Sequence, residues 1–325
     1  MKVQAQVESQ KPFGGKTMSD DRFRILSLDG GGAKGVYTLG VLREIEALIG
    51  CRLCDRFDLI FGTSTGAIIA ALLALGRRVE EIQELYDTYV PVVMKRKWRS
   101  AKSKALSELA VKVFGDTKFD AMKTNIGIVT TKWDIERPMI FKANPDQAHG
   151  RESSFTPGFG CTIGDAVQAS CSAYPFFKRK IVTTEKGDVM ELMDGGYIAN
   201  NPTLYAIADA VRAMKVAPER LRVVNVGVGE YPEPKRGPLH GTWWVSWLLS
   251  VQLLQKTLEL NTQSMDQLRI VLFGDIKTVR ISDAFTEPTM ATDMFEHNPR
   301  KLNLLRQRGV ESYAKYEKIL KEFLL

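Results

Sequence analysis

The stretch SLDGGGAKGVY, residues 27–37, joins a predicted strand to a predicted helix and sets the pattern for the chain. The residues before it, 23–28, alternate between apolar and polar side chains as a strand does. The residues after it, 36–49, carry apolar side chains at helical spacing. A strand, a glycine turn and a helix form the first unit of a parallel α/β sheet.

The same alternation continues along the chain and predicts the fold class. Further strands are expected over 57–61, 126–131, 139–141, 180–184 and 223–228, and helices over 66–76 and 203–214. This order predicts an α/β fold of three layers, in which helices flank a mainly parallel sheet. We expect residues 1–22 to form a flexible tail and residues 23–325 a single domain. Its part after about residue 240 is expected to be helical.

Composition limits the class of protein. The chain has 325 residues, of which 44% are hydrophobic and 26% charged, as in ordinary soluble proteins. No apolar run reaches the roughly 18–20 residues that span a bilayer, and residues 1–20 lack the apolar core of a signal peptide. We therefore expect a cytoplasmic protein. The net charge of +7 favours an anionic partner, such as a membrane surface, a nucleic acid or a nucleotide, without choosing among them.

The cysteines point to no metal site. Cys51 and Cys54 have C-x-x-C spacing, but no second such pair and no nearby pair of histidines accompanies them. We expect reduced thiols and predict no metal or other cofactor.

A serine lies between two glycines in FGTSTGA, residues 61–67. Gly62, Ser64 and Gly66 fit G-x-S-x-G, with a predicted strand before and a predicted helix after. This context is that of a nucleophile elbow, a sharp turn that lifts the serine out of the sheet. The glycines allow neighbouring backbones to approach, and the helix N-terminus favours negative charge during reaction.

A serine nucleophile needs a base. The histidines, His149, His240 and His297, lie in polar or Pro/Gly-rich surroundings typical of surface loops. Asp194 instead follows an apolar stretch and precedes two glycines, which indicates a strand end in a tight turn. Partial burial would raise its pKa and let it take the proton of Ser64. A plain Asp-Gly turn and a histidine-based triad remain alternatives at this point.

The glycine loop has two interpretations. Gly30, Gly32 and Gly35 fit the dinucleotide fingerprint G-x-G-x-x-G, but the acidic residue expected at the end of the second strand is missing. That place holds Ser64. The loop N–H groups can equally stabilise an oxyanion. We therefore predict an oxyanion hole made of Gly30, Gly31, Gly32 and Ala33. Lys34 is predicted as an anion contact.

Together, these motifs resemble those of patatin-like phospholipases. In order they are DGGGAKG at 29–35, GTSTG at 62–66, ASCSAYP at 169–175, DGG at 194–196 and NNP at 200–202. The resemblance covers roughly residues 23–230. It implies a patatin-like fold and an acyl hydrolase with a Ser–Asp dyad, in which Ser64 is the nucleophile and Asp194 the base. Such enzymes cleave membrane phospholipids or other acyl lipids without calcium. Lys34 stands where many relatives have Arg, whose side chain could donate two hydrogen bonds to one phosphate.

A narrower resemblance is to the phospholipase effectors of bacterial cyclic-oligonucleotide anti-phage (CBASS) defence. It implies activation by a cyclic dinucleotide, an inactive resting state, and attack on phospholipid at the inner face of the membrane. It implies no nucleic-acid partner and leaves homo-oligomerisation open. A non-catalytic nucleotide sensor and a constitutive lipid acyl hydrolase remain alternatives. A basic helix over 94–104 could bind such a ligand, dock on a membrane or be a solvated face. The Trp-rich segment 242–254 could lie at a membrane interface, or pack in the core or at a subunit contact.

Overall fold

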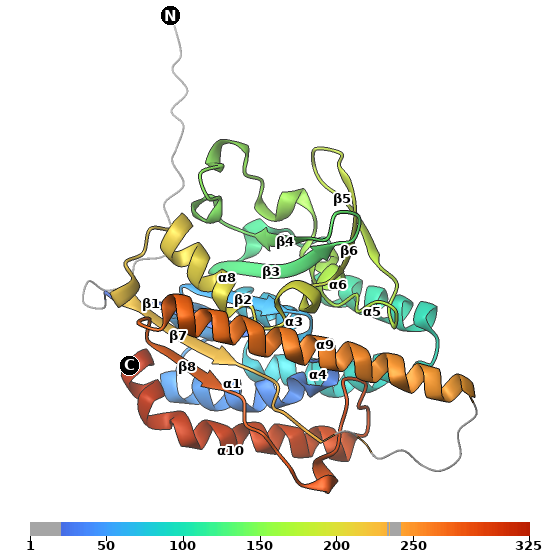
Figure 1. The fold of residues 1–325 in the computed structure, drawn as a ribbon. Coiled ribbons are helices and arrows are strands. Elements are labelled where there is room, and N and C mark those ends of the chain that lie inside the picture. The colour runs from blue at the N-terminus through green and yellow to red at the C-terminus, as the bar shows by residue number, and fades with distance from the viewer. Residues whose placement is uncertain (1–20, 233, 235–241) are drawn as a thin grey trace, which may run out of the picture.

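The computed structural model describes residues 21–232, 234 and 242–325, the last range with its side chains from residue 252 onward. A central sheet lies between two layers of helices (Figure 1). The predicted three-layer α/β architecture with a mainly parallel sheet is therefore confirmed.

The sheet has eight strands in the order β5-β6-β3-β2-β1-β7-β8, with β4 paired to β3. The strands β1, β2, β3, β7 and β8 run parallel, whereas β4, β5 and β6 join through antiparallel pairs. Their bounds are Phe23–Leu28, Leu59–Thr63, Asn125–Lys132, Arg137–Lys142, Lys180–Thr183, Val189–Asp194, Leu221–Val226 and Thr278–Ile281 for β1 to β8.

The helices of the first layer share one large core with the sheet. They are α1 (Gly35–Ile49), α2 (Leu53–Arg56), α3 (Thr65–Ala74), α4 (Val79–Met94), α5 (Arg99–Phe114), α6 (Ile163–Ser170) and α10 (Pro299–Leu324). The second layer consists of α7 (Gly196–Ala199), α8 (Thr203–Ala208) and α9 (Thr242–Phe273), and α9 crosses the sheet (Figure 1).

The two layers follow from the alternation of side chains along each strand. In β1, Leu26 and Leu28 belong to the core on the α1 side, whereas Ile25 belongs to the core on the α8 side. All three are fully buried. A parallel sheet covered on both faces needs apolar side chains on both sides of each strand, as this strand has.

The C-terminal part is not made of helices alone. After α9 the chain adds β8 to the sheet beside β7, and α10 then packs along α1. The strand β8 was not predicted, since four residues between long helical stretches give little periodicity. The close packing of α10 on α1 depends on Gly40 and Gly309, because a methyl group on either would collide with backbone carbonyls of the other helix.

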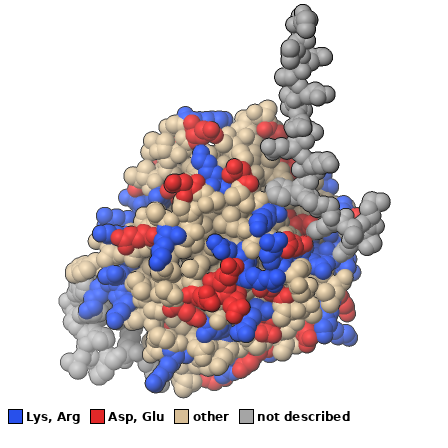
Figure 2. Space-filling view, turned by 180° about the vertical axis from the view of Figure 1, so that it is seen from behind, with Lys and Arg blue, Asp and Glu red and all other residues tan. Residues whose placement is uncertain are grey.

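The prediction of a basic helix over 94–104 is wrong, because α4 ends at Met94 and α5 begins at Arg99. The side chain of Lys102 is buried, and its Nζ donates a hydrogen bond to the carbonyl of Met94 at 2.8 Å. On the face opposite the view of Figure 1, basic and acidic side chains are interspersed (Figure 2). The positive net charge is therefore not gathered into one basic surface there.

The Trp-rich segment 242–254 begins α9. The side chains of Trp243, Trp244 and Trp247 lie outside the described residues, as does His240. Among the helices as far as they are described, none combines the length and apolar character needed to cross a bilayer.

Candidate active site

Ser64 occupies the turn between β2 and α3, where the sequence predicted an elbow. Its φ of 53° lies in the left-handed region, which is strained for a residue with a side chain. Gly62 and Gly66 have no room for a Cβ: a methyl group on Gly62 would collide with the carbonyl of Gly66, and one on Gly66 with that of Leu28. The glycines of G-x-S-x-G therefore permit the close backbone approach that holds Ser64 at the strand end.

Asp194 is the last residue of β6 and faces Ser64 across the sheet. The Ser64 hydroxyl donates a hydrogen bond to Oδ2 of Asp194 at 2.7 Å. The N–H of Gly196 donates to Oδ1 at 2.8 Å. The antiparallel pairing of β6 with β3, which lies beside β2, brings these two side chains together from positions 130 residues apart.

Burial raises the pKa of the Asp194 carboxyl into the range that suits proton transfer. Asp194 is 1% exposed, and this burial raises its pKa to about 7, although the hydrogen bonds from Ser64 and Gly196 favour the charged form. A carboxyl with a pKa near neutrality can accept a proton and return it at physiological pH. The arrangement can thus activate a serine without an imidazole.

The described histidines take no part in this pair. His149 places its Nε2 at 2.7 Å from a carboxylate oxygen of Asp209, and the Nδ1 of His297 lies near the carbonyl of Phe295. Neither has a hydrogen bond to Ser64 or Asp194 among the contacts of the described residues.

Ser170 supports the elbow, a role that the sequence did not reveal. Its hydroxyl oxygen accepts a hydrogen bond from the N–H of Ser64 at 2.9 Å and donates to the carbonyl of Val129 at 2.6 Å. The only sequence signal was its place in the ASCSAYP block. Because Ser170 contacts the backbone of Ser64 and not its hydroxyl, it is a positioning residue.

The glycine loop lies next to Ser64, and its four predicted donors are not equivalent. The N–H of Gly30 donates to the carbonyl of Asn200 at 2.9 Å, and that of Ala33 donates to the carbonyl of Met294 at 2.9 Å. Within the described part of the chain, the N–H groups of Gly31 and Gly32 have no hydrogen-bond partner. In this arrangement the predicted oxyanion hole is reduced to these two donors.

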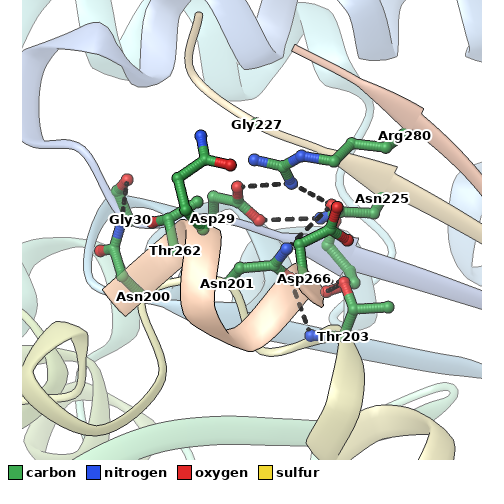
Figure 3. Close-up of polar contacts among 12 residues, drawn as sticks. Asp29, Gly30, Asn200, Asn201, Thr203, Asn225, Gly227, Thr262, Asp266 and Arg280 are labelled. Carbon is green, nitrogen blue, oxygen red and sulfur yellow. Dashed lines mark hydrogen bonds and ion pairs between the residues drawn. The ribbon is translucent and has the colours of Figure 1, made fainter. Parts of the chain in front are cut away.

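A buried network of charged and polar side chains holds the start of the glycine loop in place. The carboxylate of Asp29 accepts hydrogen bonds from Nδ2 of Asn225 at 2.7 Å and from Arg280 at 2.9 Å (Figure 3). Burial raises the pKa of Asp29, and the charge of Arg280 opposes that rise. Arg280 belongs to β8, far along the chain, so no local pattern could have identified it.

Asn200 braces the next residue of the loop. Its Nδ2 donates hydrogen bonds to the carbonyl of Gly30 at 3.3 Å and to the hydroxyl of Thr262 in α9 at 2.7 Å (Figure 3). The NNP motif therefore fixes the glycine loop to α7 and α9.

Two different cavities meet at the loop. Ser64 and Gly32 line a narrow apolar cavity of about 90 Å³, whose other walls include Met294 and Phe295. Lys34, predicted as an anion contact, instead lines a separate polar cavity of about 400 Å³. The structure therefore separates Lys34 from the cavity that holds the Ser64 hydroxyl.

The described residues hold no group of three or more His, Cys, Asp or Glu side chains arranged to bind a metal ion. All four cysteines are free thiols.

Comparison with known proteins identifies the family. The model of patatin-like phospholipases matches residues 26–207. The chain is 61% identical to a cUMP-AMP-activated phospholipase of Escherichia coli, over 94% of this chain and 95% of that protein. It is 29% identical to a cGAMP-activated phospholipase of Vibrio cholerae, over 64% of each protein. The crystal structure of VipD from Legionella pneumophila shares the fold, with a TM-score of 0.50 at 13% identity, covering 98% of this chain and 72% of that one. The chain belongs to the patatin-like phospholipase family.

Proposed function

We propose that this protein is a phospholipase that hydrolyses acyl esters of membrane phospholipids through Ser64 and Asp194. We further propose that a cyclic dinucleotide switches it on, in bacterial anti-phage defence. The observation that carries the catalytic part is the 2.7 Å hydrogen bond from the Ser64 hydroxyl to a buried carboxyl with a pKa of about 7.

In the first step, the oxygen of Ser64 attacks the ester carbonyl while Asp194 takes the hydroxyl proton. The negative charge that develops on the carbonyl oxygen is stabilised by the N–H groups of Gly31 and Gly32, which have no other partner among the described residues. When the tetrahedral intermediate collapses, Asp194 returns the proton to the departing alcohol oxygen. The lysophospholipid leaves, and the fatty acyl group stays on Ser64 as an ester.

In the second step, Asp194 takes a proton from water, and the resulting hydroxide attacks the acyl ester of Ser64. The same N–H groups stabilise the second oxyanion. Collapse returns the proton to Ser64 and releases the fatty acid. Each step needs a carboxyl that gives and takes a proton near neutral pH, which the buried position of Asp194 supplies.

Two observations support control by a nucleotide. The 61% identical relative is named for activation by cUMP-AMP, and the match extends over nearly the whole of both chains. In addition, the apolar cavity beside Ser64, at about 90 Å³, is well below the roughly 300–1,000 Å³ of ligand-holding cavities. Met294 and Phe295 line it, and the Met294 carbonyl accepts a hydrogen bond from the N–H of Ala33. This arrangement fits a resting enzyme that has to open before it admits an acyl chain.

The test measures fatty-acid release from phospholipid vesicles with and without cUMP-AMP. We expect release from the wild type only with the nucleotide, and a loss of at least about a thousandfold in Ser64→Ala. Ser103→Ala, which changes a serine of α5 whose hydroxyl accepts a surface hydrogen bond from the N–H of Lys178, serves as the matched control. Undiminished release by Ser64→Ala would overturn the catalytic proposal, and equal release without nucleotide would overturn the activation.

The alternative of a non-catalytic sensor makes a different prediction. A fluorophosphonate probe should label Ser64 in the nucleotide-treated wild type, because an activated serine reacts with it. A sensor would bind the nucleotide and leave the probe unreacted.

A further inference from the structure

The polar cavity of about 400 Å³ lies at the carboxyl ends of β1, β7 and β8, beneath α9. Ligands of open α/β sheets bind in this region, beyond the carboxyl ends of parallel strands. Its volume is within the range of cavities that hold small molecules. It shares Met294 with the apolar cavity at Ser64, and Gly30 and Gly31 form part of its wall.

Two buried polar groups line this cavity, and one of them lacks a hydrogen-bond partner within the described residues. The hydroxyl of Tyr231, in a side chain that is 9% exposed, has no hydrogen bond within the described part of the molecule. Lys34 is 4% exposed, and its Nζ forms an ion pair with Oε1 of Glu259 at 3.9 Å, which is too long for a hydrogen bond. Burial lowers the pKa of Lys34. A buried hydroxyl without a partner, and a buried ammonium whose carboxylate partner is beyond hydrogen-bonding distance, cost free energy that an anionic ligand would recover.

The remaining walls of the cavity suit a nucleotide better than a bare phosphate. Carboxylates of Glu230 and Glu259 lie on the same cavity as Lys34, and each accepts a hydrogen bond from a glutamine of α9 that also lines it. An inorganic anion would be repelled by these carboxylates. A nucleotide brings ribose hydroxyls and base N–H groups as donors for them, together with a phosphodiester for the lysine.

We infer that this cavity is the binding site of the cyclic dinucleotide, with Lys34 and the Tyr231 hydroxyl contacting its phosphodiester groups. This inference rests on the proposed function, since it assigns a place to the proposed activator. The ligand would act on the active site through the wall that the two cavities share. A phosphodiester drawn against Lys34 moves the segment that carries Gly31 and Gly32, and a nucleotide in the cavity displaces Met294 from Ala33.

The test is equilibrium binding of cUMP-AMP to the full chain carrying Ser64→Ala, measured by calorimetry. Tyr231→Phe removes only the hydroxyl and keeps the ring stacked on Phe285, so we expect about 3- to 10-fold weaker binding. Lys34→Gln should weaken binding by about 10- to 100-fold. The matched controls are Tyr205→Phe and Lys186→Gln, whose parent residues line a second, different cavity of about 690 Å³, and both should bind as the parent does. Unfolding temperatures show that each variant is folded.

The outcomes separate the inference from the proposed function. If the parent protein binds no cyclic dinucleotide, the proposed activation fails. If it binds and only the Tyr205 and Lys186 variants are weakened, the site is the second cavity, and the inference is overturned while the proposed function stands.

A phospholipid headgroup also carries a phosphodiester, and a second measurement distinguishes the two sources. With active Ser64 and saturating cUMP-AMP, Tyr231→Phe should leave the KM for phospholipid vesicles unchanged. Unchanged nucleotide affinity with a raised KM would assign the cavity to the lipid headgroup and overturn the inference.

Discussion

At the scale of single residues, the proposed role of Asp194 as the base comes with a cost in stability. Its pKa is 3.8 in an ordinary setting and about 7 in the fold. Between these values the folded protein keeps a proton that the unfolded chain has lost. The free energy of unfolding therefore falls as pH rises from about 4 to 7, and stays at its lower level above that range.

Replacing Asp194 with a side chain that does not titrate should remove this pH-dependent loss of stability. As the pH rises from 5 to 8, the wild type should lose about 2–3 kcal/mol of unfolding free energy relative to Asp194→Asn, whose side chain does not titrate. Urea denaturation at several pH values measures the difference. Parallel stability curves for the two proteins would show that Asp194 is not titrating in this range.

The same carboxyl should govern the pH dependence of catalysis. Because Asp194 must be ionised to take the proton of Ser64, activity with saturating nucleotide should rise with pH and level off above about 7. Initial rates of fatty-acid release from pH 5 to 9 measure the profile. A rate that is flat from pH 5 upward would contradict the role of Asp194 as the base.

At the scale of elements, the segment between β8 and α10 supplies Met294 and Phe295 to the wall of the apolar cavity at Ser64. Phe295 packs edge-on against Phe176 with ring centroids 5.1 Å apart, and the Nζ of Lys102 lies 4.6 Å from the centre of the Phe295 ring. These contacts hold Phe295 at the wall of the apolar cavity, because aromatic and cation–π pairs each add stability. The segment between β8 and α10 thus links α5 to the apolar cavity that an acyl chain has to enter.

Weakening the contacts of Phe295 should raise the activity of the resting enzyme. We expect Phe295→Ala to increase hydrolysis without nucleotide by about 5- to 30-fold, because 1–2 kcal/mol less stabilisation of the closed state raises the open population by that factor. Vesicle assays without nucleotide measure this change. Thr289→Ala, at an exposed position of the same segment, should behave as the wild type. Equal basal rates in all three proteins would contradict this role of Phe295.

At the scale of the whole molecule, the C-terminal part completes the domain. The strand β8 contributes Arg280 to the network on Asp29, and α10 packs along α1. The helix that begins at the glycine loop is thus held in place by the last helix of the chain. The active site depends in this way on residues at both ends of the sequence.

The crossing of α1 and α10 gives a test of this dependence. A side chain at Gly309 would collide with the backbone carbonyl of Tyr37, so Gly309→Leu should lower the free energy of unfolding by about 3 kcal/mol or more. Val310→Leu, at a neighbouring position that is 36% exposed, should change it little. Denaturant unfolding compares the two, and similar stabilities would mean that the helices can separate at little cost.

The sequence by itself determined the parts of this protein that depend on local pattern. Alternating strands and helices predicted the layered fold, and G-x-S-x-G between a strand and a helix predicted the elbow at Ser64. Both follow from short-range periodicity and from the close backbone contacts that only glycine allows. The order of the motifs indicated the family.

Only the tertiary structure decided what depends on distant contacts. It brought Asp194 to Ser64, assigned Ser170 and Arg280 to supporting positions, and left two of four predicted oxyanion donors without partners. It also placed Lys34 in a cavity apart from the serine. The physical reason is that pKa, hydrogen-bond partners and cavity walls are set by groups far apart in the chain, which strand pairing and helix packing bring together.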